Sequence, residues 1–326
     1  MRRVQQRTVY LLSVLRQMKK AIIFLSTILL TVAVTDYAIG IFCRYYIQNH
    51  ELAGRYKPLD RLLKKVDSDI ILIGNSVVLN AIDPQILTDS LSLTCYNGGI
   101  TGKSIEFSEI IINSILQRHT PQIIIIAMRP EEMGANAGDG IFDVLKPYYN
   151  MGYQSIDDYF NGSSKSEKLL LRSNLLRYNT IWIRALLYMF FDNHDYSENG
   201  FVAQEEPAVL PHIRHLTTYD QPIKRKTDAL KRIIKKCKQE GIKLYISFPP
   251  ILLCFSEKNL PCVQAVSSLC KVNSVKCFID YDNEDFLNNP RFFYDNYHLN
   301  KNGAAVYTSI LAQRLRQEVQ TEKTSH

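Results

Sequence analysis

Short apolar runs rich in β-branched residues recur along the chain. Each is too short for a typical buried helix, and the first is closed by a glycine, which is typical of a parallel strand covered on both faces. They predict strands at 69–74 (DIILIG), 92–96 (SLTCY), 122–128 (QIIIIAM), 243–248 (KLYISF) and 276–280 (KCFID).

Segments with helical spacing lie between and after these strands. The clearest are 105–117, the basic amphipathic stretch 224–240, and 303–318. Strands that alternate with helices of this length indicate a doubly wound parallel sheet. We therefore expect a three-layer α/β/α domain over residues 67–320, followed by a short tail at 321–326.

A longer apolar segment precedes this domain. As a helix, residues 21–43 would be about 34 Å long, enough to cross a hydrocarbon core of about 30 Å. The first 20 residues carry six basic residues and no acidic one, which favours a cytoplasmic tail at 1–20 and a domain outside the membrane. Residues 44–66 would then form a stalk. A cleaved signal peptide is the alternative, although the apolar run is long for one and no clear Ala-x-Ala site follows it.

Asp36 is the one charged residue within the apolar segment. A carboxylate inside a membrane is costly and is often functional. Two interpretations are open. Asp36 lies in the outer half of the span and could reach the interface, or it could pair with a polar group of a partner membrane protein.

Residues 131–222 interrupt the alternation of strands and helices. The stretch is too long for a loop without structure of its own, so we interpret it as an insertion over the carboxyl edge of the sheet. It contains the very apolar run IWIRALLYMFF at 181–191. A buried helix is the favoured explanation, because about 11 residues are too few to span a bilayer. The other is a lid, or a face that meets the membrane or a partner, with Arg172, Arg177 and Arg184 at headgroup level.

Charge and cysteine content exclude some classes of function. The net charge is +7, but most of the excess lies in the basic tail, and the body of the chain is close to neutral. It has no basic stripe with interleaved aromatic residues, which argues against nucleic-acid binding. The seven cysteines include no Cys-x-x-Cys pair, which argues against a zinc ribbon or a thioredoxin-like site. Outside the cytoplasm, a disulfide among Cys254, Cys262, Cys270 and Cys277 is one possibility, and buried free thiols are the other.

Two segments far apart in the chain carry candidate catalytic chemistry. The first strand runs directly into Gly74-Asn75-Ser76, which places a hydroxyl at the carboxyl edge of the sheet near helix-start N–H groups. Asp295 and His298 are three residues apart, so the carboxylate can orient the imidazole that a serine nucleophile needs as its base. Taken singly, Ser76 could be a helix cap and the Asp295–His298 pair a surface contact.

A glycine-rich block follows the second strand. Residues 96–102 read YNGGITG, and Gly102 lies where a strand gives way to a helix. Its bare backbone N–H could approach an oxyanion closely. A glycine-rich turn is the alternative, and the spacing is not that of the G-x-G-x-x-G dinucleotide fingerprint.

Together these blocks resemble the SGNH (GDSL-like) superfamily of serine esterases and acyltransferases over about residues 65–320. An early G-x-S, a Y-N-x-G-x-x-G block and a late D-x-x-H-L-N-x-x-G-A block occur in that superfamily's order. The chain is most similar to the membrane-anchored branch of bacterial surface-polysaccharide systems, such as the D-alanine transfer protein of teichoic acids. The resemblance implies a flavodoxin-like fold in which Ser76 is the nucleophile, His298 the base and Asp295 its orienting residue. It also implies an oxyanion hole formed by the backbone N–H groups of Ser76 and Gly102.

Two positions depart from the family's pattern. Asn75 replaces an aspartate that often precedes the nucleophile, and the third block has Arg129 near the place where an asparagine usually follows the third strand. A missing oxyanion donor typically lowers kcat by ~10²–10³. Asn75, Asn97 and Arg129 are candidate substrate contacts. Arg129 could bind an anionic group, but pairing with Glu131 or Glu132 is the favoured interpretation.

The resemblance implies an extracytoplasmic serine esterase or O-acyltransferase, periplasmic or at the cell surface. It would act on acyl esters of surface carbohydrate, without metal or organic cofactor, beside a membrane-bound O-acyltransferase. The alternative is a non-catalytic SGNH-fold binding or assembly protein in polysaccharide export. The altered third block favours this alternative, and the complete set of Ser76, Asp295 and His298 opposes it.

Overall fold

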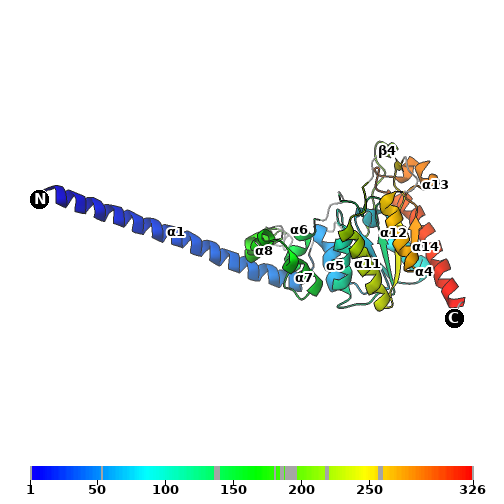
Figure 1. Cartoon of the computed structure of the whole chain (residues 1–326), viewed down its shortest axis with the longest axis horizontal. Coiled ribbons are helices and arrows are strands. Elements are labelled where there is room, and N and C mark those ends of the chain that lie inside the picture. Colours follow the sequence, from blue (N-terminus) through cyan, green and yellow to red (C-terminus); the bar gives the residue numbers. More distant parts are fainter. Residues whose placement is uncertain are drawn as a thin grey trace. The chain divides into compact units, whose positions relative to one another are not determined.

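The chain forms two compact units, which a computed structural model describes in detail. The helical unit comprises residues 1–50 and 163–192, and the sheet unit comprises 51–162 and 193–326 (Figure 1). The residues that the structure describes are 2–52, 54–135, 140–179, 181–183, 187, 197–216, 220–255 and 260–324.

A sheet of five parallel strands forms the centre of the sheet unit. The strand order is β2-β1-β3-β5-β7, which confirms the expected α/β class with a parallel sheet. Strand β1 lies between β2 and β3, so the chain connections next to β1 run toward opposite sides of the sheet. Ligands bind at such points in open α/β sheets. The strands are β1 (Ile70–Gly74), β2 (Cys95–Gly99), β3 (Ile123–Ala127), β5 (Lys243–Phe248) and β7 (Lys276–Ile279).

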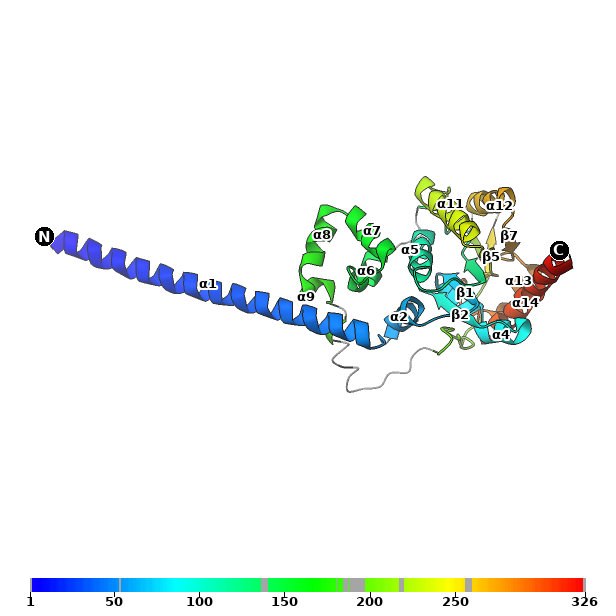
Figure 2. The ribbon, with the colours of Figure 1, turned by 90° about the horizontal axis from the view of Figure 1, so that it is seen from below.

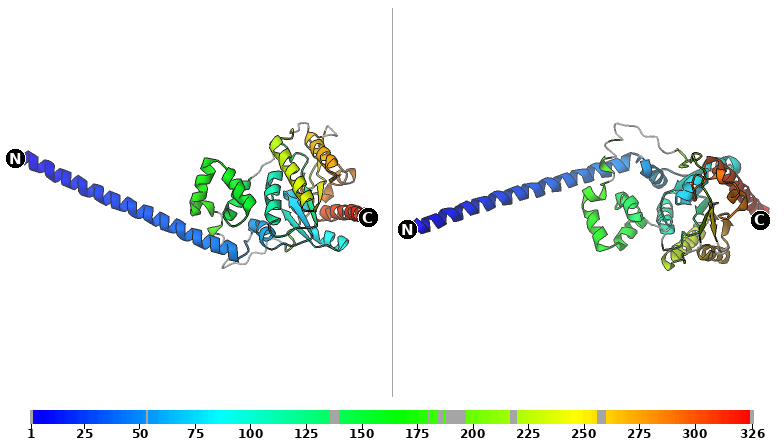
Figure 3. Two further views of the ribbon diagram at one scale, coloured as in Figure 1. Left: turned by 60° about the horizontal axis from the view of Figure 1, so that its bottom comes forward. Right: turned by 90° about the horizontal axis from the view of Figure 1, so that it is seen from above.

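Helices cover both faces of this sheet (Figures 2 and 3). The helix α14 packs against α3 and α4 on one side, and α11 packs against α5 on the other. The main helices are α2 (Lys57–Lys64), α3 (Ser76–Ala81), α4 (Pro84–Leu91), α5 (Ile105–Ile115), α11 (Lys224–Gln239), α12 (Pro261–Val272) and α14 (Lys301–Thr324).

Shorter elements complete the sheet unit. A two-stranded parallel sheet joins β4 to β6. These elements are η1 (Gly54–Tyr56), α6 (Ile141–Leu145), η2 (Lys146–Tyr148), α7 (Gln154–Gly162), β4 (Arg214–Leu216), β6 (Leu253–Phe255), α13 (Glu284–Leu287) and η3 (Pro290–Phe292).

The apolar strands form the hydrophobic core of the sheet unit together with the helices that cover them. Every residue of β1 is buried, and Ile70 and Leu72 share one cluster with Val77 of α3 and Leu311 of α14. Neighbouring residues in a strand point to opposite faces, so runs of isoleucine suit a sheet with helices on both sides. Each buried isoleucine or leucine contributes roughly 1.5–3 kcal/mol relative to an exposed one.

Strand β2 lies later in the chain than the sequence pattern suggests. Ser92 adopts φ of 54° and ends α4, so the strand begins only at Cys95 and continues through two glycines. A Cβ atom at Gly98 would lie 2.7 Å from the Leu62 side chain, and one at Gly99 would lie 2.6 Å from the Leu79 backbone. These glycines therefore allow α2 and α3 to pack directly on the strand.

The helical unit contains α1 (Arg2–Asn49), α8 (Lys165–Arg172) and α9 (Asn174–Arg177). Within α1, Tyr10–Asn49 is the one helix among the described residues that is long and apolar enough to cross a membrane, with a mean hydropathy of 2.0 over an 18-residue window. The predicted apolar helix is thus confirmed, and it extends well beyond 21–43 at both ends. Of the predicted run at 181–191, only 181–183 and 187 lie within the described residues, and Arg184 lies outside them.

Asp36 has its partners inside the chain. Its carboxylate accepts hydrogen bonds from the Ser173 hydroxyl (2.7 Å), from the backbone N–H and side-chain amide of Asn174 (3.0 and 3.1 Å), and from the Leu175 N–H (2.9 Å). These donors lie at the start of α9, where backbone N–H groups have no partner within the helix. Asp36 therefore joins α1 to α9 within the helical unit.

Candidate active site

A strained turn places Ser76 at the carboxyl end of β1. Gly74 has φ of +148°, and a Cβ atom there would lie 2.3 Å from the Ala127 carbonyl oxygen of β3, so no side chain fits. The Asn75 side chain then accepts a hydrogen bond from the Val77 N–H (2.8 Å) and caps α3. Ser76 is the first residue of this helix, and its side chain is partly exposed.

Ser76, His298 and Asp295 lie in one continuous line of contacts. His298 Nε2 is 2.8 Å from Ser76 Oγ, and His298 Nδ1 is 2.9 Å from each carboxylate oxygen of Asp295. The same carboxylate accepts the backbone N–H groups of Tyr297 (2.8 Å) and His298 (2.9 Å). All three residues belong to the sheet unit. The carboxylate therefore holds both the imidazole ring and the loop that carries it.

The electrostatics of Asp295 favour its ionised form. Burial alone would raise its pKa, but the hydrogen bonds from His298 and from the Tyr297 N–H, together with attraction to His298, hold the pKa below its usual value. An ionised Asp295 accepts a hydrogen bond from the Nδ1–H of His298, which leaves the lone pair of Nε2 directed at the Ser76 hydroxyl. This is the tautomer that can accept the serine proton.

The loop that carries Asp295 and His298 is fixed at both ends. Phe293 and Leu299 form an antiparallel bridge, and the Asn296 amide donates to the carbonyls of His212 (2.7 Å) and Leu252 (3.0 Å). The buried Asn300 side chain accepts the N–H groups at the start of α14 and donates to the Arg291 carbonyl (2.7 Å). Asn300 is the asparagine of the late D-x-x-H-L-N-x-x-G-A block, and its place just before a helix is that of a cap.

The glycine-rich block lies beside the Ser76 turn. The Ile100 N–H donates to the Gly74 carbonyl (2.9 Å), so the two turns are joined. Gly102 is exposed with φ of +71°, and a Cβ atom there would meet nothing within 4 Å. Its backbone is thus open to solvent at the same edge of the sheet.

Asn97 lies beneath α3 rather than at an open surface. Its side chain is fully buried, and its amide nitrogen donates to the carbonyls of Val78 (2.8 Å) and Ile82 (2.9 Å). Its oxygen accepts the Gly99 N–H (3.0 Å). Asn97 therefore ties the end of the Ser76 helix to β2, and both of its donors are used within the protein.

Arg129 lies beside Glu131 and the buried Glu132, the two glutamates that the sequence offers as its partners. Its Nη1 is 3.5 Å from Glu131, its Nε is 4.0 Å from Glu132, and its guanidinium lies 5.6 Å from the centre of the Tyr297 ring. The Asn75 amide donates to the Glu132 carboxyl (2.7 Å). Arg129 is therefore paired with both glutamates, and Glu132 is linked through Asn75 to the turn that carries Ser76.

Glu132 is only 3% exposed, and this burial raises its pKa to about 7. Attraction to Arg129 and to the fully buried Lys226 opposes the rise but does not cancel it. The Lys226 ammonium donates to the carbonyls of Glu132 (3.0 Å) and Gly134 (2.7 Å), so it also fixes the backbone after β3.

Replacing Glu132 with glutamine should remove a pH-dependent part of the stability. The folded state keeps a proton on Glu132 that the unfolded chain releases above its ordinary pKa of 4.5, so stability is lost as pH rises from 4.5 to about 7. The free energy of unfolding of wild type should therefore fall between about pH 5 and pH 8, and that of Glu132→Gln should lack this fall. The difference between the two proteins should change by at most about 3 kcal/mol in favour of Glu132→Gln. Urea unfolding of the full chain in micelles at the two pH values measures this, with Glu131→Gln as the matched control. Equal pH dependence in wild type and Glu132→Gln would contradict the assignment.

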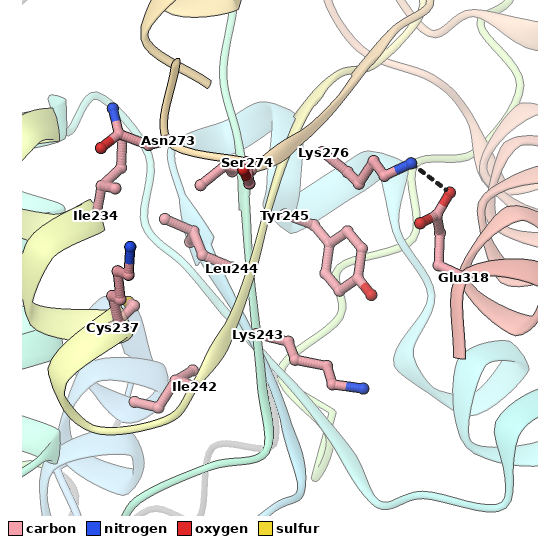
Figure 4. A pocket seen from close by; sticks show the side chains of 12 residues that line it. Ile234, Cys237, Ile242, Lys243, Leu244, Tyr245, Asn273, Ser274, Lys276 and Glu318 are labelled. Atoms are coloured by element: carbon pink, nitrogen blue, oxygen red, sulfur yellow. Dashed lines mark ion pairs between the residues drawn. The ribbon is translucent and has the colours of Figure 1, made fainter. Parts of the chain in front are cut away.

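A pocket of about 310 Å³ lies elsewhere in the sheet unit (Figure 4). It is lined at the amino ends of β5 and β7 by residues that include Lys243 and Tyr245, and an ion pair joins Lys276 to Glu318 there (3.0 Å). Because Ser76 follows the carboxyl end of β1 in a parallel sheet, this pocket is at the opposite edge. It is separate from the candidate active site.

The cysteines are free thiols, and Cys270 of α12 and Cys277 of β7 hydrogen-bond to each other through their side chains. No group of three or more His, Cys, Asp or Glu side chains within the described ranges is arranged to hold a metal ion.

In comparisons with known proteins, no family model and no curated protein matches this sequence.

Proposed function

We propose that the chain is an SGNH-type serine esterase or O-acyltransferase that acts on acyl esters of cell-surface carbohydrate. The observation that carries the proposal is the unbroken line of contacts from the Asp295 carboxylate through His298 to the Ser76 hydroxyl. The line ends at the start of a helix and at the carboxyl edge of a parallel sheet, where strand connections diverge. The carbohydrate substrate rests on the resemblance described above.

The first half of the reaction would form an acyl-enzyme. Ser76 Oγ attacks the acyl carbon while His298 Nε2 takes the hydroxyl proton, and Asp295 stabilises the resulting imidazolium. The backbone N–H groups of Ser76 and Gly102 would face the negative oxygen of the tetrahedral intermediate. Its collapse breaks the bond to the alcohol oxygen, which leaves with the proton from His298.

The second half would release the acyl group. His298 takes a proton from a sugar hydroxyl or from water, and the oxygen of that molecule attacks the acyl carbon of the ester on Ser76. The Ser76 ester bond breaks, and the proton returns to Ser76 Oγ. A sugar acceptor gives transfer and water gives hydrolysis.

Asn75 and Glu132 together place a carboxyl group beside the nucleophile turn, which the family pattern does with one aspartate. The family often has an aspartate before the nucleophile, whereas here Asn75 donates to the buried Glu132 carboxyl (2.7 Å). A carboxyl group therefore still lies beside the turn. Arg129 follows the third strand, where the family usually has an asparagine that donates to the oxyanion, but its guanidinium lies within ion-pair distance of Glu131 and Glu132. This pairing favours the second candidate function, a non-catalytic binding or assembly protein.

The proposed location is the outer face of the cytoplasmic membrane. Helix α1 is long and apolar enough to cross a bilayer, and the basic residues before residue 21 favour an amino terminus inside. The sheet unit would then work in the periplasm or at the cell surface, where a membrane-bound O-acyltransferase could supply or receive acyl groups.

The two candidate functions differ in whether the protein becomes acylated. We expect the full chain in detergent micelles, mixed with an acetylated oligosaccharide, to gain one acetyl group on Ser76 in intact-mass spectra. An unlabelled sugar acceptor or water should then discharge it. Binding of the oligosaccharide by wild type and Ser76→Ala alike, with no acylation and no turnover, would favour the binding role instead.

A further inference from the structure

The helical insert, of which the structure describes 163–179, 181–183 and 187, docks through α9 on the apolar part of α1 rather than beyond its end. Asp36 joins the two, and one turn later Gly40 allows a close approach, since a Cβ atom there would lie 2.5 Å from the Asn174 side chain. At 1.5 Å per residue, Asp36 lies about 10 Å before Cys43, the end of the apolar stretch. Around it, α1 exposes large apolar side chains such as Val34, Tyr37 and Ile41.

The insert itself exposes apolar side chains that its own packing leaves uncovered. Leu171 is buried within the unit, but neighbouring leucines and an isoleucine are between 43% and 64% exposed. Exposed basic residues accompany them on α8. The apolar residues are Leu169, Leu170, Leu176, Ile183 and Leu187, and the basic residues are Lys165, Lys168 and Arg172.

We propose that the helical insert is a second membrane-contacting element, which lies in the lipid interface beside the carboxyl half of α1. Any bilayer that surrounds the apolar part of α1 must also meet α9, because Asp36 and Gly40 hold α9 against that part of the helix. Interfacial helices bury their apolar side ≈ 5–10 Å into the boundary between headgroups and acyl chains, a depth comparable with the distance of about 10 Å from Cys43 to Asp36. Lys165, Lys168 and Arg172 would then meet anionic headgroups. Asp36, which would be costly in lipid, is satisfied by the start of α9.

A tryptophan in the insert can serve as a fluorescent probe for this proposal. Trp182, the one tryptophan of the chain, lies in the insert beside the exposed Ile183 and is partly buried. Its fluorescence therefore reports on the insert alone. This readout does not depend on the proposed acyl chemistry.

The experiment reconstitutes the full chain in vesicles of phosphatidylcholine and phosphatidylglycerol that carry bromine at shallow or deep acyl positions. We expect shallow bromines to quench Trp182 more strongly than deep ones. The double change Leu169→Glu with Leu170→Glu should reduce this quenching, whereas Val272→Glu, at an 84% exposed site on α12, should not. Asp36→Ala should also reduce it, by releasing α9 from α1.

Two results would overturn the proposal. One is Trp182 fluorescence that brominated lipid does not quench in wild type. The other is quenching that the leucine changes leave intact while cross-linking through the insert shows a second copy or another protein on that face. Circular dichroism of each variant checks that it is folded, and a misfolded double variant is replaced by the milder Leu176→Gln.

Discussion

Ser76→Ala and His298→Ala should each abolish labelling of the full chain by a fluorophosphonate, a reagent that forms a covalent bond with an activated serine. The first change removes the attacking oxygen, and the second removes the base that lies 2.8 Å from it. Losing either residue in a serine protease lowers kcat by roughly 10⁶-fold, and we expect ester turnover here to fall below detection. Intact-mass spectra measure the labelling directly.

Ser268→Ala is the matched control, because Ser268 is an exposed serine of α12 in the same unit. Its labelling should equal that of wild type. Retained labelling of Ser76→Ala would show that another residue is the nucleophile. A folded wild-type protein that takes up no reagent would favour the binding or assembly role.

Asp295→Asn should lower ester turnover by about 10⁴-fold while leaving the fold intact. The amide oxygen can still accept the backbone N–H groups of Tyr297 and His298, as Asp295 Oδ1 does. The amide NH₂ then faces His298 Nδ1 and forces it to become an acceptor. The proton moves to Nε2, which can no longer accept the Ser76 proton.

The measurement compares turnover and thermal unfolding of Asp295→Asn with those of Asp282→Asn, an exposed aspartate in the same unit. We expect a large loss of turnover without a matching loss of stability only in Asp295→Asn. A loss smaller than about tenfold would mean that Asp295 does not set the tautomer of His298. A parallel collapse of stability would mean that its role is to hold the loop.

The sheet could be predicted from the sequence because its strands are short and apolar on both faces. The run of isoleucines at β3 lies within one residue of the predicted bounds. The sequence pattern predicts β2 too early in the chain, because Gly98 and Gly99 resemble a turn when the chain is taken alone. Only the packing of α2 and α3 on these glycines explains why they belong to the strand.

The candidate site was predictable where its residues are close in sequence to strand ends or to each other. Ser76 directly follows β1, and Asp295 and His298 share one short loop. Glu132 was not predictable, because its contact with Asn75 depends on the path of the chain after β3. Asp36 is unusual from the sequence alone, but its partners cannot be predicted because they lie 137 or more residues later in the chain.

Ser76 and His298 are 222 residues apart in the chain, and this separation has a consequence for biosynthesis. The ribosome makes the nucleophile turn long before it makes the histidine loop, and contacts between distant segments form late because closing a long loop costs entropy. During synthesis Ser76 is therefore an ordinary serine without a base. If the triad is catalytic, the nascent chain is an inactive precursor that needs no separate inhibitor, and completing the fold is the step that activates it.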